Sequence, residues 1–178
     1  MQDPCPPARA PPGKYPLGDA VRGVSYKGLG LEDTFTKIYA TSAWGKGSGA
    51  GSLPVHCLRW IEFVRKFIRQ HDVRSVVDLG CGDWQFSPYI YHDLGVDYVG
   101  YDVVLPVIEE NRTQWGEQGY KFEHLEFSSK VSEIKDAELY ILKDMALICR
   151  FACFVGPLAC QFVGSFVLAV SRLFRQWC

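Results

Sequence analysis

The stretch VVDLGCGD, residues 76–83, constrains the fold of this chain more than any other feature. An apolar run over 73–80 predicts a short buried strand, which ends in two glycines, Gly80 and Gly82, separated by one residue. A helix is expected to open soon afterwards. Glycines at this place allow a tight turn and let a ligand lie against bare backbone at the carboxyl end of the strand. The pattern therefore predicts a binding turn within an α/β fold.

The segments that follow alternate between strand and helix patterns. This order predicts a Rossmann-like, doubly wound and mostly parallel sheet covered by helices. The sequence supplies about four strands, so we expect an incomplete sheet. The expected strands are 73–80, 97–104, 120–127 and 137–144, and the expected helices between them are 84–94 and 105–118.

Two helix patterns and a glycine-rich loop precede this region. A helix is expected from Leu31, and a second, amphipathic helix from Pro54, with its apolar stripe against the sheet. Between them, four glycines in seven residues predict a loop whose backbone can approach a ligand closely. The apolar stripe of the second helix consists of Leu58, Ile61, Val64 and Ile68.

The chain divides into three parts by composition. Residues 1–30 read as a flexible leader rich in proline and glycine, 31–144 as the folded domain, and 145–178 as an apolar tail. No secretory signal opens the chain, and its seven cysteines form no CxxC pair, so we expect a reducing, cytoplasmic location and no metal site. A net charge of −1 gives no indication of a nucleic-acid partner.

Asp102 is the second informative residue, because it ends a predicted strand 20 residues after Gly82. A carboxylate there can accept hydrogen bonds from the ribose of an adenosine held over the glycine turn. The alternative is that Asp102 caps the helix that follows; we favour ribose recognition. A nucleotide-cofactor oxidoreductase is disfavoured, because the dinucleotide fingerprint requires glycine where this chain has Gln85.

Three runs together resemble motifs I, II and IV of class I S-adenosylmethionine-dependent methyltransferases: VVDLGCGDWQFSPYI, VDYVGYDVV and LYILKDM. The loop SGAGS at 48–52, with Trp44 before it, resembles the N-terminal arm of a subgroup whose motif I reads DLGCGDW. The resemblance covers residues 31–146. It implies S-adenosylmethionine as cofactor and methyl transfer to an acceptor, a small molecule or another class, that the sequence does not define.

The resemblance also implies a set of cofactor-binding residues. The acid matching Asp78 would orient the glycine loop and the methionine moiety, and the arm with Trp44 would close over the cofactor. Asp102 would bind ribose and Glu126 adenine, unless Glu126 is only a solvent-facing strand residue. The remaining implied contacts are Gly80, Cys81 and Gly82 beneath the cofactor, and Lys143 and Asp144 beside the transferred methyl group.

Other roles stay open. Asp144 can equally be a strand-end cap, and Trp84 either walls the pocket or belongs to the core. No nucleophile-and-base pair is visible, so we assign no catalytic residue. Methyl transfer from a sulfonium does not require such a pair, because holding acceptor and methyl in line supplies much of the effect.

The tail departs from the family pattern. Residues 151–170 carry no charge and are long enough to span a bilayer if helical. They are a membrane anchor, a buried apolar helix or a segment unrelated to the fold, and we favour the last, because acids disappear after Asp144. The domain would then be a truncated enzyme or a non-catalytic or membrane-attached module. The strand at 137–144 would lie at an uncovered sheet edge.

Overall fold

The computed structural model describes four stretches of the chain. Some predictions fall outside them, wholly or in part: the leader as far as residue 27, Asp144, and residues 145–159, 164–165 and 171–178 of the tail. The described stretches are 28–127, 129–143, 160–163 and 166–170.

Four parallel strands form the centre of the sheet, as the sequence predicts. In order of position they run β3 (Lys121–His124), β2 (Asp97–Asp102), β1 (Ser75–Leu79) and β4 (Leu139–Lys143). The chain moves outward from β1 to β3 and then returns to the other side of β1. The carboxyl ends of β1 and β4 therefore lie at a topological switch point, the place where open α/β sheets bind ligands.

The C-terminal apolar segment is not helical where the structure describes it. β5 (Cys160–Val163) and β6 (Phe166–Val170) pair antiparallel, and β6 pairs with β4. The expected helix is therefore wrong over these residues, and β4 is an inner strand, not an uncovered edge. Two apolar runs separated by Gly164 and Ser165 are typical of a hairpin, and this signal outweighs the total apolar length. Among the described residues, no helix is long and apolar enough to cross a membrane.

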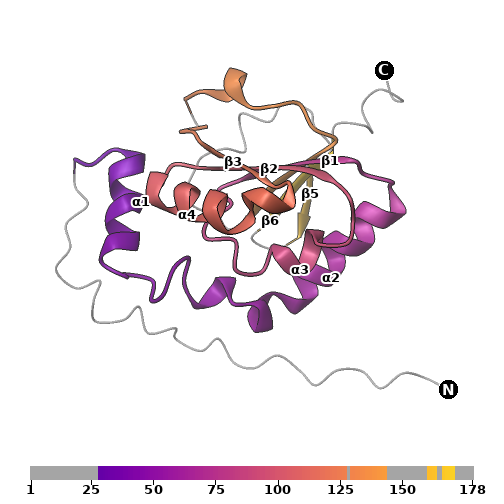
Figure 1. Ribbon diagram of the computed structural model, residues 1–178, viewed down its shortest axis with the longest axis horizontal. Helices are drawn as coiled ribbons and strands as arrows, with labels where there is room; N and C mark the ends of the chain where they lie inside the picture. The colour runs from indigo at the N-terminus through magenta and orange to yellow at the C-terminus, as the bar shows by residue number, and fades with distance from the viewer. Residues whose placement is uncertain (1–27, 128, 144–159, 164–165, 171–178) are drawn as a thin grey trace.

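The two faces of the parallel strands are covered differently (Figure 1). Helices α2, α3 and α4 lie on one face, and the segments 125–127 and 129–138 lie on the other. α1 packs against the start of α4 through Phe35, Ile38 and Val107. The helical elements are α1 (Leu31–Ala40), η2 (Ala50–Ser52), α2 (Pro54–Gln70), α3 (Pro88–Tyr91), α4 (Leu105–Trp115), η3 (Gly116–Gln118) and η4 (Val131–Glu133).

Two helix predictions require correction. Leu58 of α2 is 61% exposed, and the buried stripe starts instead with Cys57 and Trp60, which share a helix face with Val64. The helix expected over 84–94 is confined to α3. Trp84 has a φ of 58°, in the left-handed region that a helix cannot continue through.

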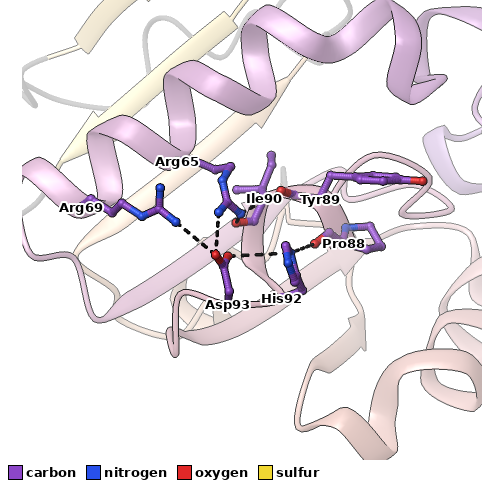
Figure 2. Close-up of polar contacts among 7 residues, drawn as sticks. All are labelled: Arg65, Arg69, Pro88, Tyr89, Ile90, His92 and Asp93. Carbon is purple, nitrogen blue, oxygen red and sulfur yellow. Dashed lines mark hydrogen bonds and ion pairs between the residues drawn. The ribbon is translucent and has the colours of Figure 1, made fainter.

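A guanidinium holds the short α3 against α2 (Figure 2). Arg65 donates from Nη1 to the carbonyl oxygens of Tyr89 and Ile90, both at 2.9 Å, and its Nη2 lies 2.7 Å from Asp93 Oδ2. Arg69 reaches the same oxygen at 3.1 Å. The hydrogen bond from Arg65 lowers the pKa of Asp93 to about 2. Arg65 thus satisfies carbonyl groups that so short a helix leaves open.

Gly100, in the middle of β2, lies where the glycine turn meets the sheet. A Cβ at this position would lie 2.9 Å from the Cβ and Sγ of Cys81 and from the Tyr98 hydroxyl oxygen. Real Cβ atoms essentially never approach so closely, so the residue must lack a side chain. Gly100 thereby leaves the space in which Cys81 and Tyr98 meet.

We expect Gly100→Ala to lower the free energy of unfolding by about 1–3 kcal/mol, the usual cost of overpacking a buried site. Gly116→Ala is the matched control, because its Cβ meets nothing within 4 Å and its φ is −60°. The control should be neutral or slightly stabilising. Urea denaturation measures both. Equal changes in the free energy of unfolding for the two variants would show that β2 and the turn can shift to accommodate a Cβ at position 100.

Candidate functional site

A cleft opens at the carboxyl ends of β1, β2 and β4, at the switch point of the sheet. The arm formed by α1 and the glycine-rich loop provides the opposite wall. The space between the walls, counted out to the open mouth, is about 840 Å³. Its lining comprises Phe35, Tyr39, Trp44, Ser48, Ser52, Trp60, Asp78, Gly80, Cys81, Gly82, Phe86, Ile90, Tyr91, Asp102, Val103, Phe127, Ile141 and Lys143.

Four successive backbone N–H groups of the glycine turn already have partners. Those of Gly80 and Cys81 donate to the Tyr101 carbonyl oxygen at 2.8 and 3.0 Å. That of Gly82 donates to Asp102 Oδ2 at 3.0 Å, and that of Asp83 donates to Ser48 Oγ at 3.1 Å. A phosphate-binding turn instead presents its N–H groups to the ligand. The turn therefore has no N–H group left at 80–83 to hold a pyrophosphate.

The carbonyl oxygen of Gly82 is held from the other side. Asn111, a buried residue of α4, donates from Nδ2 to it at 2.7 Å. Gly82 also has a φ of 57°, and a Cβ there would collide with the Ser48 hydroxyl. The glycine is therefore required both by its backbone conformation and by the close approach of the arm.

Asp102 ends β2 and connects the turn to α4. Its Oδ2 accepts the Gly82 N–H, its Oδ1 accepts the Val104 N–H at 3.0 Å, and the Val103 N–H adds a third donor. Burial raises the pKa of the carboxyl, and these three N–H groups oppose the rise. Since a carboxylate has about four lone-pair sites, one remains for a ligand in the cleft. The bond to Val104, just before α4, means that the helix-start role and a binding role can coexist.

Asp78 is a buried carboxylate at the base of the cleft, only 5% exposed. Its Oδ2 accepts a hydrogen bond from the Tyr98 hydroxyl at 2.9 Å. The Tyr98 hydroxyl oxygen in turn accepts a hydrogen bond from Trp84 Nε1 at 2.8 Å. Burial raises the pKa of Asp78 to about 7. The Tyr98 hydrogen bond and the charge of Lys143 oppose this rise, while the negative charge of Asp102 adds to it.

The glycine-rich arm is fastened to the turn by a reciprocal pair of hydrogen bonds. Ser48 N–H donates to Asp83 Oδ2 at 3.0 Å, while Ser48 Oγ accepts the Asp83 N–H. The Tyr39 hydroxyl lies 2.6 Å from the same Ser48 oxygen. Burial raises the pKa of Tyr39 above its ordinary value, so the phenol stays protonated. Trp44 packs edge-on against Phe35, with ring centroids 5.7 Å apart.

Aromatic rings and one ammonium group complete the cleft. Seven of its lining residues are aromatic, so a ligand meets ring faces over much of its surface. Lys143 Nζ lies 5.1 Å from the centroid of the Phe86 ring, a cation–π geometry. The cleft therefore combines two buried carboxylates and a lysine with an apolar, polarisable wall.

The structure brings seven of the predicted cofactor-binding residues together in this cleft. Glu126 does not line it; it is half-buried and accepts from the Ser129 hydroxyl at 2.8 Å. Asp144 lies outside the described residues. Trp84 is 1% exposed and belongs to the core, not to the cleft wall. The seven are Trp44, Asp78, Gly80, Cys81, Gly82, Asp102 and Lys143.

Sequence reasoning missed the contributions of α1 and of the linking side chains. Tyr39 and Phe35 were visible only as apolar positions of a helix, and nothing in their spacing points to the cleft. Asn111 bonds the turn and Tyr98 bonds Asp78, each from another element, and only the folded arrangement shows these contacts. Within the described stretches, no three His, Cys, Asp or Glu side chains are grouped so as to hold a metal ion.

No protein-family model matches the sequence, and no curated protein matches it. Solved structures do resemble the fold, with low sequence identity. A protein described as a sarcosine dimethylglycine methyltransferase from Galdieria sulphuraria has a TM-score of 0.39 and 15% identity. That match covers 46% of this chain and 34% of the other, so this chain spans about a third of that protein's length.

Two further structures are similar to a comparable degree. A ribosomal protein L11 methylase from Lactobacillus delbrueckii subsp. bulgaricus has a TM-score of 0.41 and 11% identity, covering 65% of this chain and 78% of that one. An O-methyltransferase family protein from Burkholderia thailandensis has a TM-score of 0.42 and 10% identity, covering 78% and 58%. The similarity at this level concerns the arrangement of the chain and does not define a reaction or a substrate.

The arm's attachment gives a direct prediction at Gly47. This residue has a φ of 59°, and a Cβ there would overlap the Asp83 carboxylate. We expect Gly47→Ala to displace the loop and to cost about 1–3 kcal/mol of stability. Amide hydrogen exchange at Ser48 and Asp83 should become faster as their reciprocal bonds break.

Gly51→Ala is the control in the same loop, because its Cβ meets nothing within 4 Å and its φ is not positive. It should leave exchange at Ser48 and Asp83 unchanged. Retained protection of both amides in Gly47→Ala would contradict the attachment.

Proposed function

We propose that this chain binds S-adenosylmethionine in the cleft and is a methyltransferase by function. The observation that carries the proposal is the state of the glycine turn. Its N–H groups at 80–83 are all engaged within the protein, while two buried carboxylates, Asp78 and Asp102, line the same cavity. Such a site suits a ligand with hydroxyl groups and positive charge, and it repels phosphate.

The nucleoside part of the ligand fits the half of the cleft around Asp102. One lone-pair site of this carboxylate is left for a ribose hydroxyl, and Gly80 and Gly82 present no side chain beneath the sugar. Backbone N–H groups favour the charged form of Asp102 and oppose the rise in its pKa that burial causes. The hydrogen bonds that the N–H groups of the turn already make argue against a dinucleotide, because its pyrophosphate requires free N–H donors.

The amino-acid and sulfonium end fits the half of the cleft around Asp78. An ionised Asp78 would pair with the ligand's ammonium group, and the aromatic rings would attract the positive sulfonium. Lys143 would lie near the ligand's carboxylate or the acceptor. The arm would cover this end through Trp44 and Ser48.

When bound, the cofactor supplies an electrophilic methyl group. The protein's part is to bind the cofactor, exclude water with its aromatic wall, and hold the acceptor in line. We assign no general base, and none is required where the attacking acceptor atom carries no proton that must leave. This reading accords with the family resemblance of the three sequence motifs.

Binding of S-adenosylhomocysteine, the demethylated product, tests the proposal. We expect a calorimetric signal with the full chain and none with NAD. Asp102→Ala should weaken binding by about 1–3 kcal/mol, because a ribose hydroxyl loses its buried partner. This is about a 5- to 150-fold rise in Kd.

Asp97→Ala is the control on the same strand. Its carboxylate pairs with Lys121 and Lys135 at 3.0 and 2.7 Å and does not line the cleft. Both variants are first checked by urea denaturation, because Asp102 also holds the turn. Equal Kd values for Asp102→Ala and Asp97→Ala, or tighter binding of NAD than of S-adenosylhomocysteine, would refute the assignment.

A further inference from the structure

The described residues provide one hydrogen bond to the Asp78 carboxylate, and it comes from a chain of buried side chains. Trp84 Nε1 donates to the Tyr98 hydroxyl oxygen at 2.8 Å, and that hydroxyl donates to Asp78 Oδ2 at 2.9 Å. All three groups are at least 95% buried, so water does not compete for these bonds. The direction of donation is fixed, because an indole N–H can only donate.

The sheet register explains how this chain can form. Asp78 lies opposite Gly100, and Val76 lies opposite Tyr98, so Tyr98 reaches Asp78 diagonally across two strands. The path crosses Gly100, whose missing side chain leaves room for the phenol. The hydrogen bond from Tyr98 to Asp78 therefore depends on glycine at position 100 of β2.

Trp84 occupies its place at a cost. Its φ of 58° puts a bulky residue in the left-handed region, where residues other than glycine are uncommon and a bulky side chain is strained. The aromatic cluster around it fixes the indole so that its N–H meets Tyr98. The rings in contact with Trp84 are Tyr91, Tyr98, Trp115, Tyr120 and Phe122.

We propose that Tyr98 and Trp84 are positioning residues for Asp78, which together hold its carboxylate in place and in the charged form that binds the ligand's ammonium group. The inference rests on the proposed function of the cleft and adds to it two residues that touch no ligand. Tyr98 orients Asp78 directly, and Trp84 orients Tyr98.

The charges around Asp78 agree with this role. From β2 it faces Tyr98 and Asp102, from β4 Lys143, from the turn Cys81, and from α3 Tyr91. Burial raises the pKa of Asp78 to about 7, and the Tyr98 hydrogen bond is the largest effect that lowers it. Removing that bond should therefore raise the pKa, and with it the pH needed to ionise Asp78.

The test compares Tyr98→Phe with Tyr120→Phe in the full chain. Tyr120 lies in the same aromatic cluster, 6.0 Å from the Tyr98 ring, and its hydroxyl is not among the donors to Asp78. Carbon-13 NMR of the Asp78 carboxyl gives its pKa without any ligand. We expect a rise of about one unit in Tyr98→Phe, as for loss of a charge-assisted hydrogen bond, and no change in Tyr120→Phe.

Binding of S-adenosylhomocysteine should follow the same titration. If the ligand binds ionised Asp78, a one-unit rise weakens binding about fivefold at pH 7, and the difference falls below about twofold by pH 8.5. Trp84→Phe should shift the pH dependence of binding in the same direction but by a smaller amount. This variant serves as the test if Tyr98→Phe does not fold.

The outcomes separate the two proposals. If the parent chain binds no S-adenosylhomocysteine at any pH, the proposed function is wrong, and the carboxyl titration still tests the hydrogen-bond chain. If the parent binds and Tyr98→Phe shows the parent's Asp78 pKa and pH profile, the positioning role is wrong. A loss of affinity of equal size at pH 7 and pH 8.5 would also overturn it, because a merely structural effect does not follow the titration of Asp78.

Discussion

The carboxylate of Asp102 is the group on which the rest of the site depends. It holds the Gly82 N–H of the turn after β1 and the Val104 N–H that precedes α4, each at 3.0 Å. The side chain of Asp102 thereby joins β2, which it ends, to the turn and to the start of α4. Burying a charge is costly unless hydrogen bonds replace its water, and here backbone N–H groups supply that replacement. With the turn fixed, Asn111 and Ser48 can close on it from α4 and from the arm.

This arrangement leaves the chemistry of the cleft to side chains. A turn whose N–H groups are engaged does not attract anions, so ligand choice falls to Asp78, Asp102 and the aromatic wall. The two carboxylates lie in different environments: three N–H groups stabilise Asp102, whereas Asp78 has the Tyr98 hydroxyl and a pKa of about 7. Burial raises the pKa of both acids; backbone N–H groups oppose the rise at Asp102, and the Tyr98 hydroxyl opposes it at Asp78.

The sequence was informative wherever a local pattern decides the structure. The strands, the glycine turn and the placement of Asp102 follow from short apolar runs and from glycine spacing, and all are confirmed in position. Leu58 was misassigned because two apolar stripes are compatible with α2 and tertiary packing selects one. The tail was expected to be an apolar helix or a segment unrelated to the fold, whereas its residues 160–163 and 166–170 form strands that pair with each other and with β4. The contacts of Asn111 and Ser48 with the turn, and that of Tyr98 with Asp78 of β1, join residues that are 20 to 35 positions apart in sequence. No local pattern encodes them.

The central claim is that the cleft at the carboxyl ends of β1, β2 and β4 binds an S-adenosyl ligand. The most direct measurement is a titration of nitrogen-15-labelled full chain with S-adenosylhomocysteine, followed by amide NMR. We expect saturable shifts at Gly80, Gly82 and Val103 and in the arm at Ser48. Little change is expected at Lys121 and Lys135, which both pair with Asp97 at the start of β2. Shifts confined to these two lysines, or no saturable shift at the glycine turn, would contradict the claim.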